Sequence, residues 1–393
     1  MLIAFDSFFL TARFRNVGIY EYTKNLLLEF QKTAKGSINI QCFASPTDSP
    51  DALRRKSSSG IQAVETKALD FPWLWRVGLV NHAAVRAGAD LLFSPSPQIV
   101  PWGLLPVAVT IHDAIPSRLP PHLIEGRTTL LKMMTRVAAK RSDKILTDSE
   151  HSKQDLVQLY NLPPEKVSVV HLGYNRSTFN ASPPDAAIQD RLLLSLGIRS
   201  PYILHHGLVQ VRKNLARLIQ AYKILLSRRP RFEFQLVLAG QFGFGSDQIR
   251  READDLVNSG RIIFAGELGE QQLATVIKGA SLCVIPSLYE GFCLPMVESM
   301  ACGVPTIASN SSCLPEISGG VLRYFDPVSE EEMAATIEMV LDRPSLQSDL
   351  ATHGLKRASQ FSWSRCAQET LAVLTGVPAQ REATRPSLSE IGV

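Results

Sequence analysis

The sequence predicts an α/β protein with two doubly wound parallel-sheet domains that face a cleft. The chain has 393 residues, which suits two domains of ordinary size. Hydrophobic residues make up 45% and charged residues 20%, so there is enough apolar surface for large cores. Short β-rich runs alternate with helical periodicity, and this alternation builds parallel sheets with helices on both faces.

The first half alternates six strand-like runs with four helical stretches, so we expect residues 1–180 to form the N-terminal domain. The expected strands are 2–6, 38–44, 90–94, 106–111, 144–147 and 166–170. The expected helices are 19–31, 73–87, 122–142 and 150–160. Pro, Gly, Asn and Ser cluster between these runs and indicate turns.

The second half alternates more regularly, and residues 198–360 are expected to form the C-terminal domain. Its expected strands are 202–206, 234–240, 261–266, 281–287 and 304–309. Its expected helices are 215–229, 247–258, 270–279 and 295–302. The stretch 174–200, with its NASPPD turn, is the expected linker. Residues 377–393 are expected to form a flexible tail, because the chain becomes polar and aperiodic after Arg381.

Composition argues against several classes of protein. The six cysteines form no CxxC pair and no Cys/His ligand spacing, so we expect no metal site and a reducing, cytoplasmic compartment. Asp6 interrupts the apolar start, which argues against a signal peptide, and four prolines interrupt the uncharged run 91–111. Residues 1–180 carry a net charge of +6 and residues 181–393 one of −2, an asymmetry too small to predict nucleic-acid binding.

Residues 286–298 carry the most informative pattern. A buried strand is expected to end at Pro286, and Pro295 suits the first turn of a helix. Glu298 is expected to lie in that first turn, on the side that faces the loop. A helix N-terminus beside a glycine turn attracts an anion such as a diphosphate. Glu290 and Glu298 would then flank that anion and accept hydrogen bonds from sugar hydroxyls. Each glutamate alone is explained more simply, Glu290 as a turn residue and Glu298 as a helix-dipole charge.

The whole string resembles the Glu-x7-Glu motif of glycosyltransferase family 4, whose members are retaining nucleotide-sugar glycosyltransferases with the GT-B fold. Further segments, within residues 1–376, are similar to the family's phosphate loop, base-binding turn, His-Asp segment and closing segment. They are Gly207–Asn214, Gly266–Leu268, Thr110–Pro116, and Phe361–Trp363 with the following helix to residue 376, which would cross back to the N-terminal domain.

The resemblance implies two Rossmann-like domains and a metal-independent, retaining hexosyltransferase. The C-terminal domain would bind a nucleotide-diphosphate sugar, with GDP-mannose as the first choice of donor and rhamnosyl or another hexosyl transfer as the second. The N-terminal domain would bind a saccharide acceptor, expected to be lipid-linked, in the assembly of a cell-surface polysaccharide or glycolipid. No separate cofactor is implied.

The resemblance also assigns roles to single residues. His112 and Glu290 would be catalytic. The donor-binding positions would be Gly18, Gly207, Arg212, Lys213, Gly266, Leu268, Gly291, Phe292, Cys293, Leu294 and Glu298. Leu208 stands where many members have a basic residue, so the diphosphate would depend on Arg212 and Lys213.

Other histidines and one loop position have simpler interpretations. A hydrogen-bonded core histidine is the alternative for His112, and we interpret His205 and His206 as structural. Cys293 stands where glycine is frequent, which predicts a backbone that avoids positive φ there. GQFGFG (240–245) has the wrong spacing for a dinucleotide fingerprint and is interpreted as a plain β–α turn.

A basic stretch could bring the enzyme to a membrane. Residues 122–144 hold six Lys/Arg against two acids, and a stripe recurs every four residues at Lys132, Arg136, Lys140 and Lys144. One interpretation is an ordinary surface helix. The other is peripheral contact with anionic lipid on the inner face of the membrane.

Two rival functions stay open on the sequence. A catalytically silent nucleotide-sugar-binding partner subunit would be expected to have lost Lys213, Glu290 or Glu298, and all three are present. A dinucleotide oxidoreductase is disfavoured because there is no GxGxxG between a first strand and helix.

Overall fold

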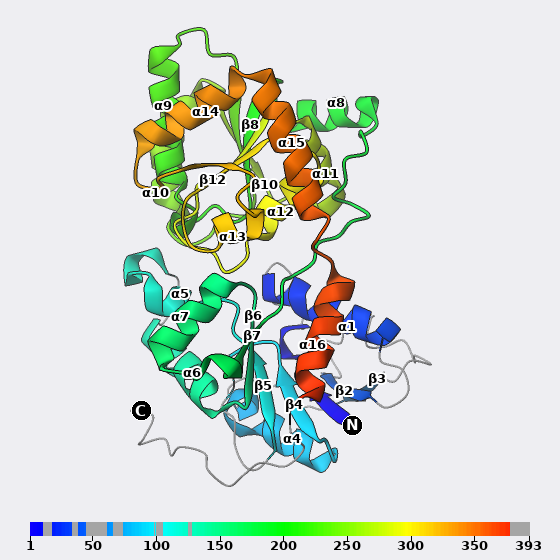
Figure 1. Ribbon diagram of the computed structural model, residues 1–393. Coiled ribbons are helices and arrows are strands. Elements are labelled where there is room, and N and C mark those ends of the chain that lie inside the picture. The colour runs from blue at the N-terminus through cyan, green and yellow to red at the C-terminus, as the bar shows by residue number, and fades with distance from the viewer. Residues whose placement is uncertain are drawn as a thin grey trace. The chain divides into compact units, whose positions relative to one another are not determined.

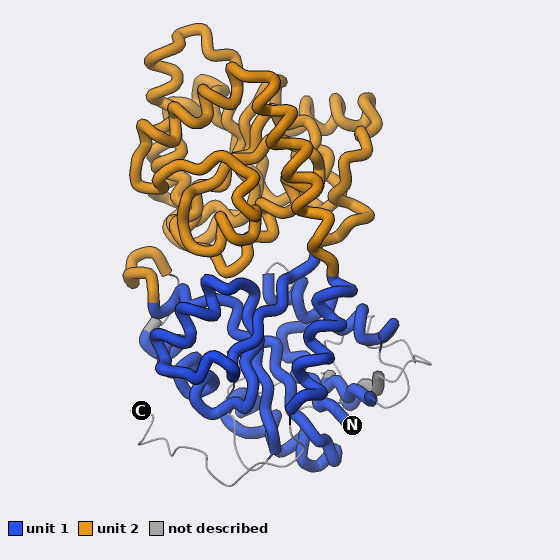
Figure 2. The backbone as a smooth tube through the Cα atoms, in the orientation of Figure 1, with its two compact units in different colours: residues 1–117, 127–173, 363–393 blue, residues 118–126, 174–362 orange. Residues whose placement is uncertain are grey.

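A computed structural model describes residues 1–10, 18–33, 38–44, 61–65, 74–97, 99, 105–124 and 128–377. The chain forms two compact units, coloured blue and orange in Figure 2. Unit 1 comprises residues 1–117, 127–173 and 363–393, and unit 2 comprises residues 118–126 and 174–362. The sequence predicts a division between residues 180 and 198, whereas in the structure the chain passes from one unit to the other at 117/118, 126/127, 173/174 and 362/363.

Unit 1 is built on a seven-stranded parallel sheet with the strand order β3-β2-β1-β4-β5-β6-β7. The strands are β1 (Leu2–Phe5), β2 (Asn39–Ala44), β3 (Ile61–Glu65), β4 (Leu91–Ser94), β5 (Val107–Thr110), β6 (Lys144–Thr147) and β7 (Val167–Val169). Every residue of β4 and β5 is buried, which explains their continuous apolar runs, because helices cover both faces of a parallel sheet. The sequence missed β3, an edge strand that pairs only with β2.

Helices surround this sheet (Figure 1). They are η1 (Phe8–Leu10), α1 (Gly18–Thr33), η4 (Trp75–Leu79), α4 (Val80–Arg86), α5 (Ile115–Arg118), α6 (Thr128–Arg141), α7 (Glu150–Tyr160), η6 (Pro164–Lys166) and α16 (Trp363–Thr375). Ser149 caps α7, because its Oγ accepts a hydrogen bond from the Ser152 amide at 3.1 Å, and Asn161 ends the helix in the left-handed conformation. The distant helix α16 packs against α1, with the Tyr22 and Trp363 rings 6.3 Å apart.

Unit 2 has a six-stranded parallel sheet with the order β10-β9-β8-β11-β12-β13. The strands are β8 (Tyr202–His206), β9 (Gln235–Ala239), β10 (Ile262–Gly266), β11 (Leu282–Ile285), β12 (Thr306–Ser309) and β13 (Arg323–Phe325). Strands β8, β9, β11 and β12 are buried throughout. Their order reverses between β8 and β11, and ligands of doubly wound sheets bind beyond the carboxyl ends of the strands at such a point.

Unit 2 contains the following helical segments. They are η5 (Pro121–Leu123), α8 (Ala186–Ser195), η7 (Val211–Lys213), α9 (Leu215–Arg228), α10 (Ser246–Asn258), α11 (Glu270–Gly279), α12 (Leu294–Ala301), α13 (Leu314–Ser318), α14 (Glu330–Leu341) and α15 (Pro344–Ala358). The linker expected at 174–200 contains α8, whose first turn Asp185 caps by accepting from the Ile188 amide at 3.0 Å. Helix α14 begins after Ser329, which accepts from the Glu332 amide, and three glutamates lie in its first turn, where the helix dipole favours negative charge.

Two findings bear on the sequence expectations. All six cysteines are free and buried. Among the described residues, no helix is both long enough and apolar enough to cross a bilayer. Residues 378–393, which hold most of the expected tail, lie outside the described residues.

Candidate functional site

The candidate donor site of unit 2 is assembled from the loops that follow β8, β9, β10 and β11. Parallel strands bring these loops to one edge of the sheet. The Leu288 amide donates to the Arg212 carbonyl at 3.1 Å, and this bond joins the loop after β11 to the loop after β8. The glycosyltransferase motifs recognised in this half of the sequence therefore share one edge.

Asn214 fixes the turn that carries Arg212 and Lys213. It is buried and adopts the left-handed conformation, with φ of 61°. Its Nδ2 donates to the Pro286 carbonyl at 3.1 Å and to the Pro327 carbonyl at 2.7 Å. The short helix η7 therefore ends at a residue anchored to two neighbouring loops, and this anchoring holds the two basic side chains in place.

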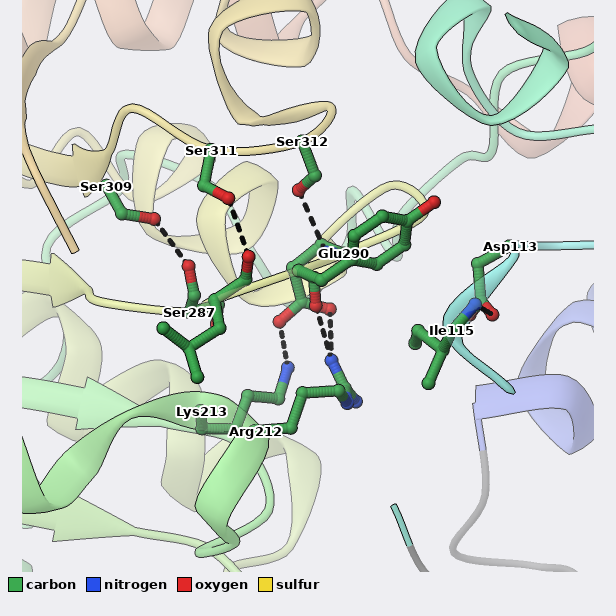
Figure 3. A network of polar contacts seen from close by, with 11 residues as sticks. Asp113, Ile115, Arg212, Lys213, Ser287, Glu290, Ser309, Ser311 and Ser312 are labelled. Carbon is green, nitrogen blue, oxygen red and sulfur yellow. Dashed lines mark hydrogen bonds and ion pairs between the residues drawn. The ribbon is translucent and has the colours of Figure 1, made fainter. Parts of the chain in front are cut away.

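Glu290 binds both basic residues (Figure 3). Lys213 Nζ lies 2.5 Å from Glu290 Oε1, and Arg212 Nη1 lies 3.0 Å from Glu290 Oε2. Burial raises the pKa of the Glu290 carboxyl, but the nearby charges of Lys213 and Arg212 outweigh it and lower the pKa to about 2. Glu290 and Lys213 are buried and Arg212 is half-buried, and the three side chains form a cluster with a net charge of +1, which we call the Glu290 triad.

Backbone contacts hold the triad's glutamate from its other side (Figure 3). The Glu290 amide donates to Ser312 Oγ at 2.9 Å. Ser311 Oγ donates to the Leu288 carbonyl and Ser309 Oγ to the Ser287 carbonyl, both at 2.6 Å. Serines of β12 and the loop after it thereby fix the conformation of residues 287–290, and no motif in the sequence predicts this support.

Two expectations about the following helix are wrong. Cys293 adopts φ of 73° and ψ of 70°, the left-handed conformation that the sequence predicted it would avoid. Its position as the residue before α12 requires a sharp turn, and a non-glycine residue in that conformation costs about 1–3 kcal/mol. Helix α12 begins at Leu294 with Pro295 in its first turn, so Glu298 is its fifth residue and lies in the second turn.

Glu298 lies beside a neutral histidine. Glu298 Oε2 is 3.8 Å from His206 Nδ1, while His206 Nε2 is 2.9 Å from Ser299 Oγ. Burial, together with the positive charge of Lys213, lowers the pKa of His206 to about 3. The contact between Glu298 and His206 is therefore not an ion pair at neutral pH, and the carboxylate keeps capacity to accept further hydrogen bonds.

The GQFGFG segment braces the predicted phosphate loop. The Val209 amide donates to the Gln241 carbonyl at 2.8 Å, and the Gly243 amide donates back to the Val209 carbonyl at 2.9 Å. A Cβ on Gly240 would lie 1.9 Å from the Gly207 carbonyl oxygen, and one on Gly245 would lie 2.3 Å from Val211 Cγ1. These glycines allow the two loops to touch, so the segment is more than the plain turn that the sequence indicated.

The remaining predicted donor positions lie around the same edge. Gly266 ends β10 with φ of 68°, and Leu268 is half-buried two residues later. Gly291 and Phe292 are buried beside Glu290, and the Phe292 ring packs on the Phe361 ring at 5.2 Å. Gly207 directly follows β8 and has φ of 120°, and a Cβ there would lie 3.5 Å from Pro295 Cγ. Leu294 is half-buried at the start of α12.

The other predicted residues, His112 and Gly18, belong to unit 1. His112 follows β5, and its Nδ1 lies 2.8 Å from Asp148 Oδ2. The sequence did not single out Asp148, which follows the neighbouring strand β6. Gly18 is exposed at the start of α1, and the loop before it, 11–17, lies outside the described residues. In the described part of the chain, no group of three or more His, Cys, Asp or Glu side chains is placed to hold a metal ion.

Family models match both halves of the chain. A model described as "Glycosyl transferases group 1" matches residues 196–357, and one described as "Glycosyltransferase Family 4" matches residues 27–178. The first match contains the whole Glu290 triad, and the second contains His112 and Asp148.

Individual proteins agree with these matches. The chain is 29% identical to "O-antigen chain mannosyltransferase B" of Escherichia coli, over 73% of this chain and 75% of that protein. It is 30% identical to "MMP alpha-(1->4)-mannosyltransferase" of Mycolicibacterium hassiacum, over 62% of this chain but only 56% of that protein.

Solved structures share the fold at low sequence identity. The Anabaena protein Alr3699/HepE, in complex with UDP and glucose, superposes with a TM-score of 0.70 at 16% identity, over 96% of this chain and 100% of that chain. WaaG, a glycosyltransferase involved in lipopolysaccharide biosynthesis, superposes with a TM-score of 0.68 at 15% identity, over 95% and 100% of the two chains. The two Rossmann-like units, the site motifs and the two family matches together place the chain in glycosyltransferase family 4, as a glycosyltransferase with the GT-B fold.

Proposed function

We propose that the protein is a retaining mannosyltransferase that moves mannose from a nucleotide-diphosphate donor, GDP-mannose first, to a saccharide acceptor. The main observation behind the proposal is the Glu290 triad, in which one buried carboxylate forms ion pairs with two cationic side chains at the carboxyl edge of the sheet. The relatives named as mannosyltransferases support the choice of sugar.

The triad suits a diphosphate electrostatically. Glu290 neutralises one of the two positive charges of Arg212 and Lys213, and the start of α12 adds the positive end of a helix dipole nearby. A diphosphate carries more negative charge than one carboxylate and can share these cations with Glu290. The same cations would stabilise the charge that develops on the phosphate as the sugar leaves, so the protein itself supplies this stabilisation without a metal ion.

The two glutamates are proposed to contact opposite ends of the donor. Glu298, which is 17% exposed and faces a neutral His206, would accept hydrogen bonds from the ribose hydroxyls. Glu290, held ionised by its two partners, would contact the transferred sugar. His112 of unit 1 would also contact the transferred sugar or its developing charge, and the leaving phosphate would accept the acceptor's proton in a front-face reaction that retains configuration.

The acceptor is proposed to be a lipid-linked saccharide in the assembly of a cell-surface polysaccharide, reached from the inner face of the membrane. Helix α6 supports this, because Leu130 and Met133 are 37% and 40% exposed on it, beside Arg136. The basic stripe is partly engaged within the protein: Lys140 Nζ donates to the Asn161 carbonyl at 3.3 Å, and Lys144 Nζ donates to the Glu165 carbonyl at 2.6 Å. On the same helix Lys132 is half-buried and Arg136 is exposed, so these two are the basic residues that we propose contact anionic lipid.

A donor panel tests the proposal. GDP-mannose should raise the melting temperature of the full chain more than UDP-glucose, UDP-galactose or dTDP-rhamnose, because stabilisation follows affinity by mass action. Turnover in the presence of EDTA and NMR of the product's anomeric proton then test metal independence and retention. Donor binding without turnover on any saccharide acceptor would favour the alternative function, a catalytically silent nucleotide-sugar-binding subunit.

A further inference from the structure

A buried carboxylate lies directly against the imidazole of His112. His112 Nδ1 and Asp148 Oδ2 are 2.8 Å apart, and the Asp148 side chain is 5% exposed. The two residues follow β5 and β6, which are neighbours in the sheet with Thr110 aligned to Leu146. The register of these two strands, and not a local motif, brings the pair together.

Further contacts fix the orientation of the ring. The Tyr22 ring meets the His112 ring edge to face, with centroids 4.7 Å apart, and the Tyr22 hydroxyl lies 3.0 Å from Thr110 Oγ1. Ser152 Oγ donates to the His112 carbonyl at 3.3 Å. Tyr22 of α1 therefore packs on one side of the imidazole, and Ser152 of α7 holds the backbone of His112. Asp148 holds one of the two ring nitrogens.

The other nitrogen, Nε2, is the one that Asp148 does not engage. His112 Nε2 is buried, and within the described part of the chain it has no hydrogen-bond partner. A carboxylate can only accept, so Nδ1 must carry the proton that lies between His112 and Asp148. In the neutral ring Nε2 is then an acceptor for a hydroxyl, and in the charged ring it becomes a donor to an oxygen that gains negative charge.

We propose that Asp148 is the positioning residue for His112: it fixes the ring with hydrogen on Nδ1 and directs Nε2 to an oxygen of the transferred sugar. This inference rests on the proposed function, because it assigns His112 to the sugar site. Asp148 itself touches no substrate and acts only through the imidazole.

The charges around the ring agree with this role. Burial lowers the pKa of His112, but Asp148, by charge and hydrogen bond, and Asp113 outweigh burial and leave the pKa raised. The backbone of Pro95 also favours the charged form of the ring. The other titratable groups near the pair are Tyr22 and Cys366, and burial raises the pKa of each, so both stay neutral.

The first test reads the ring directly in the full-length protein, by NMR of ¹⁵N-labelled histidine across pH. We expect His112 to be protonated at Nδ1 in its neutral form and to titrate at higher pH than in Asp148→Asn. Hydrogen on Nε2 in the wild-type protein, or an unchanged titration in Asp148→Asn, would overturn the proposal. Neither readout needs substrate, so the test stands even if the enzyme transfers no mannose.

The second test separates positioning from packing by kinetics. Asp148→Asn should lower kcat by about 10- to 100-fold, as loss of a histidine's outer partner does in metal sites, with the donor KM within about twofold. In Asp148→Asn, the part of the pH–rate profile that reports the protonation of His112 should move to lower pH. Equal losses in kcat at all pH values, with the limb unmoved, would show a packing role only.

A matched control is available in the same unit. Asp155 is also a buried aspartate beside a histidine, with Oδ2 3.5 Å from His151 Nε2 on α7. Asp155→Asn should leave both the His112 titration and the pH–rate profile unchanged. If His112→Gln keeps wild-type turnover while the NMR result holds, Asp148 positions the ring but the sugar-site role of His112 fails.

Discussion

The carboxylate of Glu290 lies 2.5 Å from the ammonium group of Lys213, and both side chains are buried. Arg212 completes the arrangement at 3.0 Å on the other carboxylate oxygen. Charge-assisted hydrogen bonds of this kind are strong, and breaking one partner of a buried pair leaves an uncompensated charge. The site therefore holds its cations in place through the same glutamate that we assign to the sugar.

Lys213→Ala should weaken nucleoside-diphosphate binding by roughly 10- to 100-fold, because a charge-assisted contact is worth about 1.5–3 kcal/mol. Calorimetric titration with GDP measures the change. Lys223→Ala is the control, since Lys223 is a surface residue that lies 4.0 Å from Glu252. Equal affinity in Lys213→Ala and the wild-type protein would remove Lys213 from the diphosphate site.

Glu290→Ala and Glu298→Ala should fail in different ways. Glu298→Ala should weaken both GDP and GDP-mannose, because ribose contacts are common to the two ligands. Glu290→Ala should bind GDP as well as or better than the wild-type protein, since Lys213 and Arg212 lose their competing anion, while kcat falls. Binding and turnover measured on both variants decide the matter, and matching profiles would contradict the division of roles.

At position 293 a glycine substitution should give a more stable protein than an alanine substitution, the reverse of the usual order. At an ordinary position, glycine is less stable than alanine by about 0.5–1 kcal/mol, but at φ of 73° glycine escapes the strain that alanine keeps. Urea unfolding should therefore find Cys293→Gly more stable than Cys293→Ala. The control is Cys302, at the other end of α12 with φ of −77°, where alanine should be the more stable substitution.

Unit 2 should lose stability as the pH falls below 6.5. Burial is the main cause that lowers the pKa of His205 to about 4 and that of His206 to about 3, so between pH 6.5 and 4 the unfolded chain binds protons that the folded chain does not. Each such histidine contributes a slope of about 1.4 kcal/mol per pH unit, with the free energy of unfolding rising with pH.

The raised pKa of His112, in unit 1, adds no slope below pH 6.5, since its contribution is fully present below its unfolded pKa and is lost only as the pH rises through the folded value. Chemical denaturation at pH 6.5, 5.5 and 4.5 therefore tests the contribution of the two buried histidines. His206→Asn should reduce the slope of the free energy of unfolding against pH by about 1.4 kcal/mol per pH unit, which corresponds to one proton. His353→Gln, at an exposed position, serves as the control. A slope that His206→Asn leaves unchanged would show that His206 is charged in the folded protein.

Binding to anionic vesicles should depend on Lys132 and Arg136. Each cation near a charged bilayer contributes about 1 kcal/mol, so association should be reversible and should weaken as salt is added. Co-sedimentation with phosphatidylglycerol vesicles should be lost in Lys132→Ser/Arg136→Ser, and kept in Lys223→Ser/Arg228→Ser on helix α9 of unit 2. Binding that is absent from the wild-type protein, or that ignores salt, would leave a soluble acceptor.

Most of the fold could be predicted because buried parallel strands and amphipathic helices leave strong patterns. Strands 144–147 and 202–206 match their predicted bounds. The sequence does not predict the edge strands β3 and β13; in β13 only Phe325 is buried, so this strand has no continuous apolar run. The sequence predicts a linker where α8 lies, because only Leu193 of this helix is buried and its apolar periodicity is therefore weak.

The candidate site divides in the same way. Lys213, Glu290 and Glu298 lie in local sequence motifs, so their positions could be predicted from the sequence. Asp148 does not, because it meets a residue 36 positions earlier through the register of β5 and β6. The left-handed backbone at Cys293 was also hidden, since the demand for a sharp turn comes from where α12 must begin and not from the residue itself.

Because α16 belongs to unit 1 but lies at the end of the chain, the two units can complete their folding at different times during synthesis. Residues 174–362 emerge as one continuous stretch that holds the whole sheet of unit 2, so this unit can begin to fold as soon as that stretch is free. Unit 1 begins the chain but completes its surface only when residues 363–375 arrive to cover α1. The apolar face around Tyr22 therefore stays uncovered until nearly two hundred later residues have been synthesised. During this interval unit 1 would depend most on chaperones, because exposed apolar surface promotes aggregation.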